Sequence, residues 1–215
     1  MSIKLEQLSP MEIEQRSFAI IEEELLQQNI HLSSEQAPII KRCIHTTADF
    51  EYATSLCFSP DALEKAHTAI CEGASLVTDT TMALSGINKR ALAQFGIQTY
   101  NFIADPDIVK KSRETGITRS ALSMDKAAQI DTPMIYVIGN APTALIRIYE
   151  LYQEQKITPA LVIGVPVGFV NVVQSKELIM ETEMPYIIAR GRKGGSNVAA
   201  AIMNALLYRE RRPEL

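Results

Sequence analysis

The segment MIYVIGNAPTALIRIYELYQEQK, residues 134–156, contains the pattern that decides the fold. Its first five residues form an uninterrupted apolar run, which is typical of a strand buried on both faces of a parallel sheet. A short glycine-containing turn follows, and Pro142 stands where proline is best tolerated, in the first turn of a helix. The segment therefore predicts a strand over residues 134–138 and a helix over residues 142–156.

The same pattern of strand, turn and helix recurs on both sides of this segment. Short apolar runs occupy residues 74–78, 97–102, 161–165 and 186–189, and each precedes polar or glycine-rich residues and then a helical pattern. Three helical patterns come first, over residues 10–29, from the stretch between Ser34 and Pro38, and after Asp61. We therefore predict an α/β fold, a three-layer α/β/α arrangement with a mostly parallel sheet of about five strands and an N-terminal helical segment.

Composition places the chain among globular proteins and limits its partners. The 215 residues fit a single domain over residues 1–215, and 47% of them are hydrophobic. The net charge of −4 argues against a nucleic-acid partner. No apolar run approaches the roughly 20 residues that cross a bilayer, so no membrane is expected. Residues 1–10 also lack the pattern of a secretory signal.

The cysteines and histidines show no metal-binding motif. Three cysteines without a CxxC motif indicate reduced thiols in a cytoplasmic protein. The histidines, His31, His45 and His67, are far apart in the sequence, and HExxH is absent. We therefore predict a cytoplasmic protein without a bound metal.

Polar residues follow every predicted strand. In open α/β sheets, ligands bind beyond the carboxyl ends of the strands, so these residues should converge on one edge of the sheet. They are residues 79–81, Asn101 with Asp105, residues 139–142, residues 164–168 and residues 191–196.

Residues 191–196, Gly-Arg-Lys-Gly-Gly-Ser, carry the clearest binding signal among these loops. Gly194 and Gly195 permit close approach of a ligand, Ser196 is placed to cap the next helix, and a helix N-terminus favours anions. Arg192 and the neighbouring lysine add positive charge. The loop is either a site for phosphate or carboxylate or an ordinary turn with solvated basic residues. Neither GxxxxGK[ST] nor GxGxxG is present, so nucleotide binding lacks its usual support.

His45 is the candidate for proton transfer. Histidine both gives and accepts a proton near neutral pH. Arg42 lies three residues earlier and shares roughly one helix face with it, and Asp49 would orient the ring if the helix continued that far. A structural or simply exposed histidine is the alternative.

Two further positions have both a structural and a binding interpretation. Ser17 interrupts the apolar stripe of the first helix, either as a small packing residue or as a hydroxyl directed into a cavity. Arg119, in Thr118-Arg119-Ser120, is either an anion contact or a surface arginine next to a helix cap.

Taken together, these segments resemble the precorrin-8X methylmutase family, which includes the cobalt-precorrin-8 methylmutases. The resemblance covers nearly the whole chain, and its specificity lies in the order of its pieces. They are RSFAII at 16–21, Arg42-x-x-His45, Thr118-Arg119-Ser120, GNAPTAL at 139–145, PVGFV at 166–170 with Ser175-Lys176, and GRxGGS at 191–196. One segment differs, since residues 171–174 read NVVQ where the family often has Gly-Ala-Ala-Glu.

The resemblance implies an isomerase of cobalamin biosynthesis. In this family a methyl group moves from C11 to C12 of precorrin-8X or cobalt-precorrin-8, giving hydrogenobyrinic or cobyrinic acid, by a sigmatropic shift that needs no cofactor. The family's catalytic histidine falls on His45, and substrate contacts fall on Ser17 and Arg42. A homodimer is also implied, and the sequence does not tell the metal-free from the cobalt substrate.

The chemistry of this ligand agrees with the candidate residues. A tetrapyrrole of this class is a large, mostly apolar ring with carboxylates at its edge, and arginine binds carboxylates strongly and directionally. We expect further substrate contacts from Arg119, Arg192 and the loop residues Gly194, Gly195 and Ser196. Two other functions compete: an isomerase or transferase for phosphorylated metabolites, and a non-catalytic carrier of the corrin product.

Overall fold

The structure, a computed structural model, describes residues 7–210; residues 1–6 and 211–215, with most of the stretch tested for a secretory signal, lie outside the described residues. The helices are α1 (Pro10–Gln27), α2 (Ala37–Thr47), α3 (Tyr52–Ser55), α4 (Ala62–Cys71), α5 (Thr81–Gly86), α6 (Lys89–Gln94), α7 (Pro106–Thr115), α8 (Arg119–Ala127), α9 (Pro142–Gln153), α10 (Val172–Met180) and α11 (Ser196–Arg209). The strands are β1 (Leu56–Phe58), β2 (Ser75–Thr78), β3 (Thr99–Tyr100), β4 (Met134–Ile138), β5 (Leu161–Gly164) and β6 (Tyr186–Ala189).

The strands form one sheet in the order β1-β6-β5-β4-β2-β3. β2 to β6 are parallel, which confirms the predicted mostly parallel sheet. β1 is an edge strand that the sequence patterns do not predict, and it pairs antiparallel with β6, with Leu56 opposite Ala189. It follows directly on the short helix α3 and has three residues, too few to show a period.

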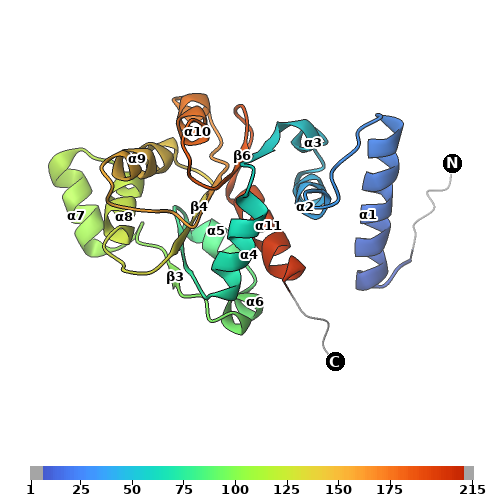
Figure 1. The fold of residues 1–215 in the computed structure, drawn as a ribbon, viewed down its shortest axis with the longest axis horizontal. Helices are drawn as coiled ribbons and strands as arrows, with labels where there is room; N and C mark the ends of the chain where they lie inside the picture. Colours follow the sequence, from blue (N-terminus) through green and yellow to red (C-terminus); the bar gives the residue numbers. More distant parts are fainter. Residues whose placement is uncertain (1–6, 211–215) are drawn as a thin grey trace.

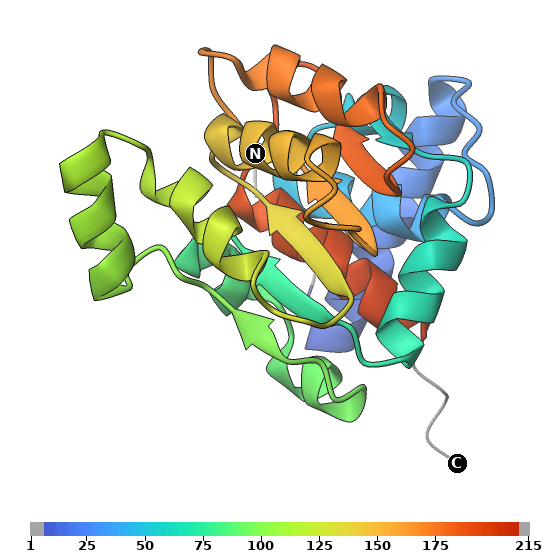
Figure 2. The same cartoon turned by 60° about the vertical axis from the view of Figure 1, so that its left-hand side comes forward.

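The central strand β4 shows why its sequence is apolar without interruption. All five of its residues are buried. Ile135 and Val137 share a core with residues of α4 and α11, whereas Tyr136 and Ile138 share a core with residues of α8 and α9. Successive side chains of a strand point to opposite faces, so helices cover both faces and the sheet is the middle of three layers (Figure 1 and Figure 2).

A helical layer lies outside α11, as expected for the N-terminal segment. α2 packs on α11, and α1 packs on α2 at the edge of the molecule (Figure 1). The apolar stripe expected on α1 is only partly buried: Ile21 and Leu25 belong to the core, but Ile13 is 53% exposed and Ile20 is 38% exposed. The outer side of α1 therefore presents apolar surface. Within residues 7–210, no helix has the length and apolar character needed to span a membrane.

Gly164, at the end of β5, tests how tightly the core around the sheet is packed. A Cβ atom there would collide with Cδ1 of Ile188 and lie 3.2 Å from Cδ1 and Cδ2 of Leu145. Gly164→Ala should therefore lower the free energy of unfolding by about 1–3 kcal/mol. Ile188→Val removes the colliding atom, so the double variant should be less destabilised than the sum of the two single variants. Chemical denaturation of the four proteins measures this coupling, and strict additivity would contradict the packing argument.

Candidate active site

The loops that follow the parallel strands meet at one edge of the sheet, called here the carboxyl edge. Asp79, which follows β2, is 1% exposed, and its carboxylate accepts hydrogen bonds from the backbone N–H groups of Gly139, Asn140 and Ala141 at 2.9, 2.8 and 2.7 Å. Burial raises the pKa of Asp79, while the three N–H donors act in the opposite direction. The predicted convergence of these two loops is therefore confirmed.

The loop of residues 191–196 closes against the same edge. The N–H of Gly195 donates to the carbonyl oxygen of Val165 at 2.9 Å. A Cβ atom at Gly194 would collide with that same oxygen, so the close approach of the two backbones requires glycine. Ser196 is not the cap of α11, contrary to the sequence-based expectation. Gly195 occupies the cap position, and the Ser196 hydroxyl lies 2.8 Å from the hydroxyl of Thr80 in a hydrogen bond.

Lys176 stabilises this loop from the protein interior. Its side chain is 1% exposed, and its ammonium donates to the carbonyl oxygens of Gly191 at 2.7 Å and Lys193 at 2.9 Å. Burial lowers the pKa of Lys176 from 10.5 to about 8. The sequence resemblance includes Lys176 but gives it no role. The available signal was a lysine on the buried side of α10, beside Val172 and Ile179.

The basic residues of the loop differ in their surroundings. Lys193 forms ion pairs with Asp49 at 2.6 Å and Glu51 at 2.7 Å, and both partners raise its pKa. Its charge is therefore compensated within the chain. Arg192 is exposed, and its guanidinium lies 5.6 Å from the ring centre of Phe169. The Lys193 ion pairs also bring the loop to the end of the helix that carries His45.

His45 lies in the last turn of α2 and is exposed. Its ring stacks on Phe18 of α1, with ring centres 5.2 Å apart and planes inclined by 22°. The guanidinium of Arg42 lies 4.9 Å from the centre of the same Phe18 ring and forms an ion pair with Glu14 at 2.6 Å. The expectation that His45 and Arg42 share a helix face is confirmed. Phe18 is the shared contact, and its place in RSFAII was the only signal for it.

Asp49 does not orient the His45 ring as an extension of the helix. α2 ends at Thr47, because Ala48 adopts the left-handed conformation with φ of 54°. The Asp49 carboxylate instead accepts hydrogen bonds from Lys193 and from the N–H of Glu51. The bond from Lys193 is the largest cause of the lowered pKa of Asp49. The condition under which Asp49 would orient the His45 ring, a helix that continues to Asp49, is therefore not met.

Ser17 and Arg119 lie on different sides of the site. Ser17 is half-buried next to Phe18, and its hydroxyl donates to the Ile13 carbonyl at 2.8 Å within the helix. Arg119 is exposed and donates to the carbonyl of Ile103 at 3.4 Å. The hydroxyl of its neighbour Thr118 caps α8 and donates to Thr143 at the start of α9. Arg119 therefore belongs to the carboxyl edge near β4, whereas Ser17 belongs to the α1–α2 pair.

The loop after β5 carries three exposed apolar side chains. Phe169 is 83% exposed, Val170 is 78% exposed and Val167 is 45% exposed, and Arg192 stands over Phe169. An apolar surface next to an arginine suits a large, flat, apolar anion. The exposed histidine at the end of α2 offers a proton donor on the same side of the molecule.

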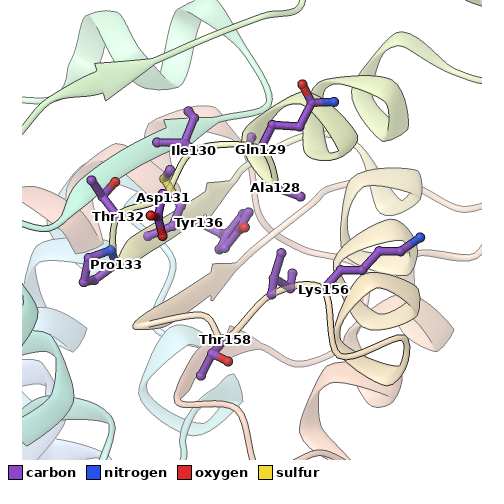
Figure 3. A pocket seen from close by; sticks show the side chains of 12 residues that line it. Ala128, Gln129, Ile130, Asp131, Thr132, Pro133, Tyr136, Lys156 and Thr158 are labelled. Carbon is purple, nitrogen blue, oxygen red and sulfur yellow. The ribbon is translucent and has the colours of Figure 1, made fainter.

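Two cavities differ in their position relative to the carboxyl edge of the sheet. One, of about 550 Å³, borders the site and is lined by Phe18, Arg42 and Tyr208 among others. Another, of about 530 Å³, lies where β4 begins and is lined by Pro133, Tyr136 and Lys156 among others (Figure 3). The second lies at the amino end of the sheet, away from the carboxyl edge where ligands bind in this architecture.

Comparison with known proteins adds independent information. A family model described as precorrin-8X methylmutase matches residues 12–209. A cobalt-precorrin-8 methylmutase of Salmonella typhimurium is 48% identical over 93% of this chain and 95% of its own length. A precorrin-8X methylmutase of a Sinorhizobium species is 35% identical over 90% of this chain and 92% of its own. The crystal structure of a precorrin-8x methyl mutase from Thermus thermophilus superposes with a TM-score of 0.82 at 36% identity, over 91% of this chain and 96% of that one.

The buried ammonium of Lys176 predicts a pH-dependent contribution to stability. Between pH 8 and pH 10.5 the unfolded chain binds a proton at this lysine that the folded chain has lost. The contribution of Lys176 to the free energy of unfolding should therefore rise with pH across this window and be flat below it. Denaturation of wild type and Lys176→Met from pH 7 upward measures the difference.

The control for this experiment is Lys110→Met, because the Lys110 side chain is 77% exposed. Its difference from wild type should not change with pH. A constant gap between wild type and Lys176→Met up to pH 10.5 would show that Lys176 keeps its ordinary pKa.

Proposed function

The chain belongs to the precorrin-8X methylmutase family, and we propose that it moves a methyl group from C11 to C12 of precorrin-8X or cobalt-precorrin-8 with His45 as the acid. It is an isomerase of cobalamin biosynthesis that acts on a tetrapyrrole. The family match over residues 12–209 includes every residue assigned to the site. Family membership favours methyl transfer over both alternatives, a phosphate-binding isomerase and a corrin carrier.

One observation carries the role of His45. The histidine and Arg42 occupy one face of α2, and both contact the Phe18 ring. A proton donor and a cation held by the same aromatic side chain can engage two parts of one ligand, its ring and a carboxylate at its edge. Because His45 is exposed, a substrate can reach it without a rearrangement of the core.

The mechanism follows from where the proton goes. Protonated His45 donates to a nitrogen of the macrocycle, and the positive charge spreads over the conjugated ring. The bond between C11 and the methyl group then breaks as the bond to C12 forms, and the nitrogen returns its proton to His45. Proton donation of this kind contributes about 10²–10⁴-fold in rate. The remaining acceleration comes from holding the ring in a reactive shape.

The proposed substrate contacts surround the ring on its charged edge. Arg42, Arg119 and Arg192 bind carboxylates, for which a guanidinium is suited by its paired donors. Gly194, Gly195 and Ser196 bring the start of α11 and its dipole to the ligand. Ser17 contributes from α1 beside Phe18. Lys193, which is paired with two carboxylates, positions the loop and does not bind the substrate directly.

A homodimer in the cytoplasm is part of the proposal. One side of α1 carries exposed apolar residues that a second copy of the chain would cover: Ile13 at 53% and Ile20 at 38% exposed, two turns apart on the helix. The three cysteines are free, which suits a reducing compartment. The chain acts as one domain, without a cofactor, metal or nucleic acid in the reaction.

Replacing His45 tests the acid directly. Purified wild type and His45→Ala are each mixed with precorrin-8X and with cobalt-precorrin-8, and absorbance is followed because the shift alters ring conjugation. Turnover by His45→Ala should fall about 10²–10⁴-fold, with the substrate still bound.

His31→Ala provides the matched control, because His31 is also exposed but lies outside the proposed site. It should convert substrate at the wild-type rate. Equal conversion by wild type and His45→Ala would leave the family assignment intact and remove the role of His45. Product binding without conversion by wild type would instead support the carrier.

The dimer is tested by adding charge to α1. Ile13→Glu combined with Ile20→Glu should convert the dimer to a monomer in sedimentation analysis, because two carboxylates on one side of α1 would be buried at the interface. Ile117→Glu is the control, since Ile117 is 45% exposed between α7 and α8. A double variant that sediments as the wild type would place the interface elsewhere.

A further inference from the structure

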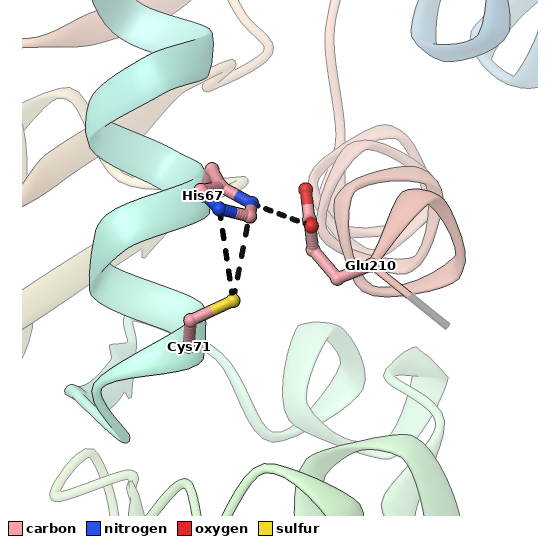
Figure 4. A group of neighbouring side chains, drawn as sticks. All are labelled: His67, Cys71 and Glu210. Atoms are coloured by element: carbon pink, nitrogen blue, oxygen red, sulfur yellow. Dashed lines mark hydrogen bonds and ion pairs between the residues drawn. The ribbon is translucent and has the colours of Figure 1, made fainter. Parts of the chain in front are cut away.

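We propose that His67, Cys71 and Glu210 form a binding site for a divalent cation of the zinc class (Figure 4). His67 and Cys71 lie one turn apart on α4, and Glu210 directly follows α11. The side chains thus come from two elements distant in sequence, and their donor atoms all lie within 4.8 Å of one another. The proposal is independent of the methylmutase reaction.

Two of the three donor pairs lie near the spacing of a tetrahedral metal site. Sγ of Cys71 lies 3.8 Å from Nδ1 and 4.0 Å from Nε2 of His67, and Nδ1 lies 2.6 Å from a carboxylate oxygen of Glu210. Ligand bonds of about 2.0–2.3 Å in a tetrahedral zinc site place neighbouring donors about 3.3–3.7 Å apart. The ion therefore takes the place of the proton between His67 and Glu210, and these two groups separate by about 0.7 Å.

The donor set selects the class of metal. Imidazole nitrogen and thiolate sulfur suit Zn²⁺ and Co²⁺, whereas Mg²⁺ and Ca²⁺ require oxygen ligands. Three protein donors leave a fourth position for water. Cys71 is exposed, so a metal can reach its sulfur, whereas Cys43 is buried and Cys57 is only partly accessible.

The surroundings favour a cation. His67 also lines a cavity of about 460 Å³ whose other residues include Glu35, Asp61 and Glu64, with Arg209 as the one basic residue among those that line it. A concave surface with an excess of carboxylates raises the local concentration of cations. The side chain of Glu210 is only 12% exposed, so its carboxylate is held in place before any ion arrives.

None of the three residues, His67, Cys71 and Glu210, belongs to the proposed substrate site. Loop 191–196 ends at Ser196, the first residue of α11, and Glu210 follows the last residue of this helix. A helix of 14 residues is about 20 Å long, so the metal would bind at the end of α11 opposite loop 191–196. Arg42, whose guanidinium lies 5.4 Å from the ring centre of Tyr208, is the proposed substrate contact nearer to the metal's end of the helix. A bound ion would tie the end of α11 to α4.

Cobalt titration of the full-length protein, freed of metal and without tetrapyrrole, tests the site. Co²⁺ bound by a thiolate gives a charge-transfer band in the near ultraviolet, and Zn²⁺ should displace it. We expect one Co²⁺ per chain, loss of the band in Cys71→Ser, and Zn²⁺ affinity reduced at least about tenfold in His67→Gln and Glu210→Gln. Cys57→Ser and His31→Gln are the matched controls and should bind as wild type.

Three results would overturn the proposal. The first is the absence of saturable Co²⁺ binding, and the second is a band that persists in Cys71→Ser. The third is equal loss of binding in Cys57→Ser, which would indicate general thiol chemistry. Circular dichroism of each metal-free variant checks that it is folded, and Cys71→Ala replaces Cys71→Ser if the latter is not. Methylmutase turnover of Cys71→Ser should equal that of wild type with either outcome, so a failed site would leave the proposed reaction untouched.

Discussion

The carboxylate of Asp79 fixes the edge of the sheet on which the site is built. It is buried, and it accepts hydrogen bonds from three consecutive backbone N–H groups in the loop after β4. Neither partner could be left buried alone, because an unpaired charge or N–H group is costly away from water. The buried ammonium of Lys176 is satisfied similarly, because it donates hydrogen bonds to carbonyl oxygens of loop 191–196. Backbone N–H and C=O groups thus compensate both buried charges. Arg192 of the same loop takes no part in this compensation, because its side chain is exposed.

The same local rules explain what could and could not be predicted from sequence. The buried strand β4 and the start of α9 at Pro142 follow from an apolar run, a glycine and a proline, whereas α9 ends at Gln153, three residues before the predicted end. β1 escapes prediction because three residues carry no period. The helix-periodic pairing of Arg42 with His45 was predictable, but the Phe18 ring between them is a tertiary contact that no local pattern contains. The end of α2 before Asp49 was not predictable, because no sequence pattern indicates that Ala48 adopts the left-handed conformation.

Electrostatics in this protein is local. The chain has a net charge of −4, yet the proposed substrate is a ring with carboxylates at its edge. Lys193 forms ion pairs with Asp49 and Glu51, and Arg42 forms an ion pair with Glu14. These ion pairs hold basic side chains near the site, and the paired carboxylates offset their positive charge. The binding of an anion can then exchange one carboxylate partner for another, which is a smaller change than recruiting a mobile, fully hydrated cation.

α1 gives the site an unusual dependence on local stability. This helix buries Ile21 and Leu25, packs on α2 and stands at the edge of the molecule, whereas β4 is buried along its whole length. Regions with few buried apolar contacts open in partial fluctuations well below the free energy of global unfolding. Because Phe18 and Ser17 lie on α1, such an opening would dismantle one wall of the proposed substrate site while the sheet stayed native. Amide hydrogens of α1 would then exchange with solvent earlier than those of β4, and a bound macrocycle would slow them by holding the wall shut.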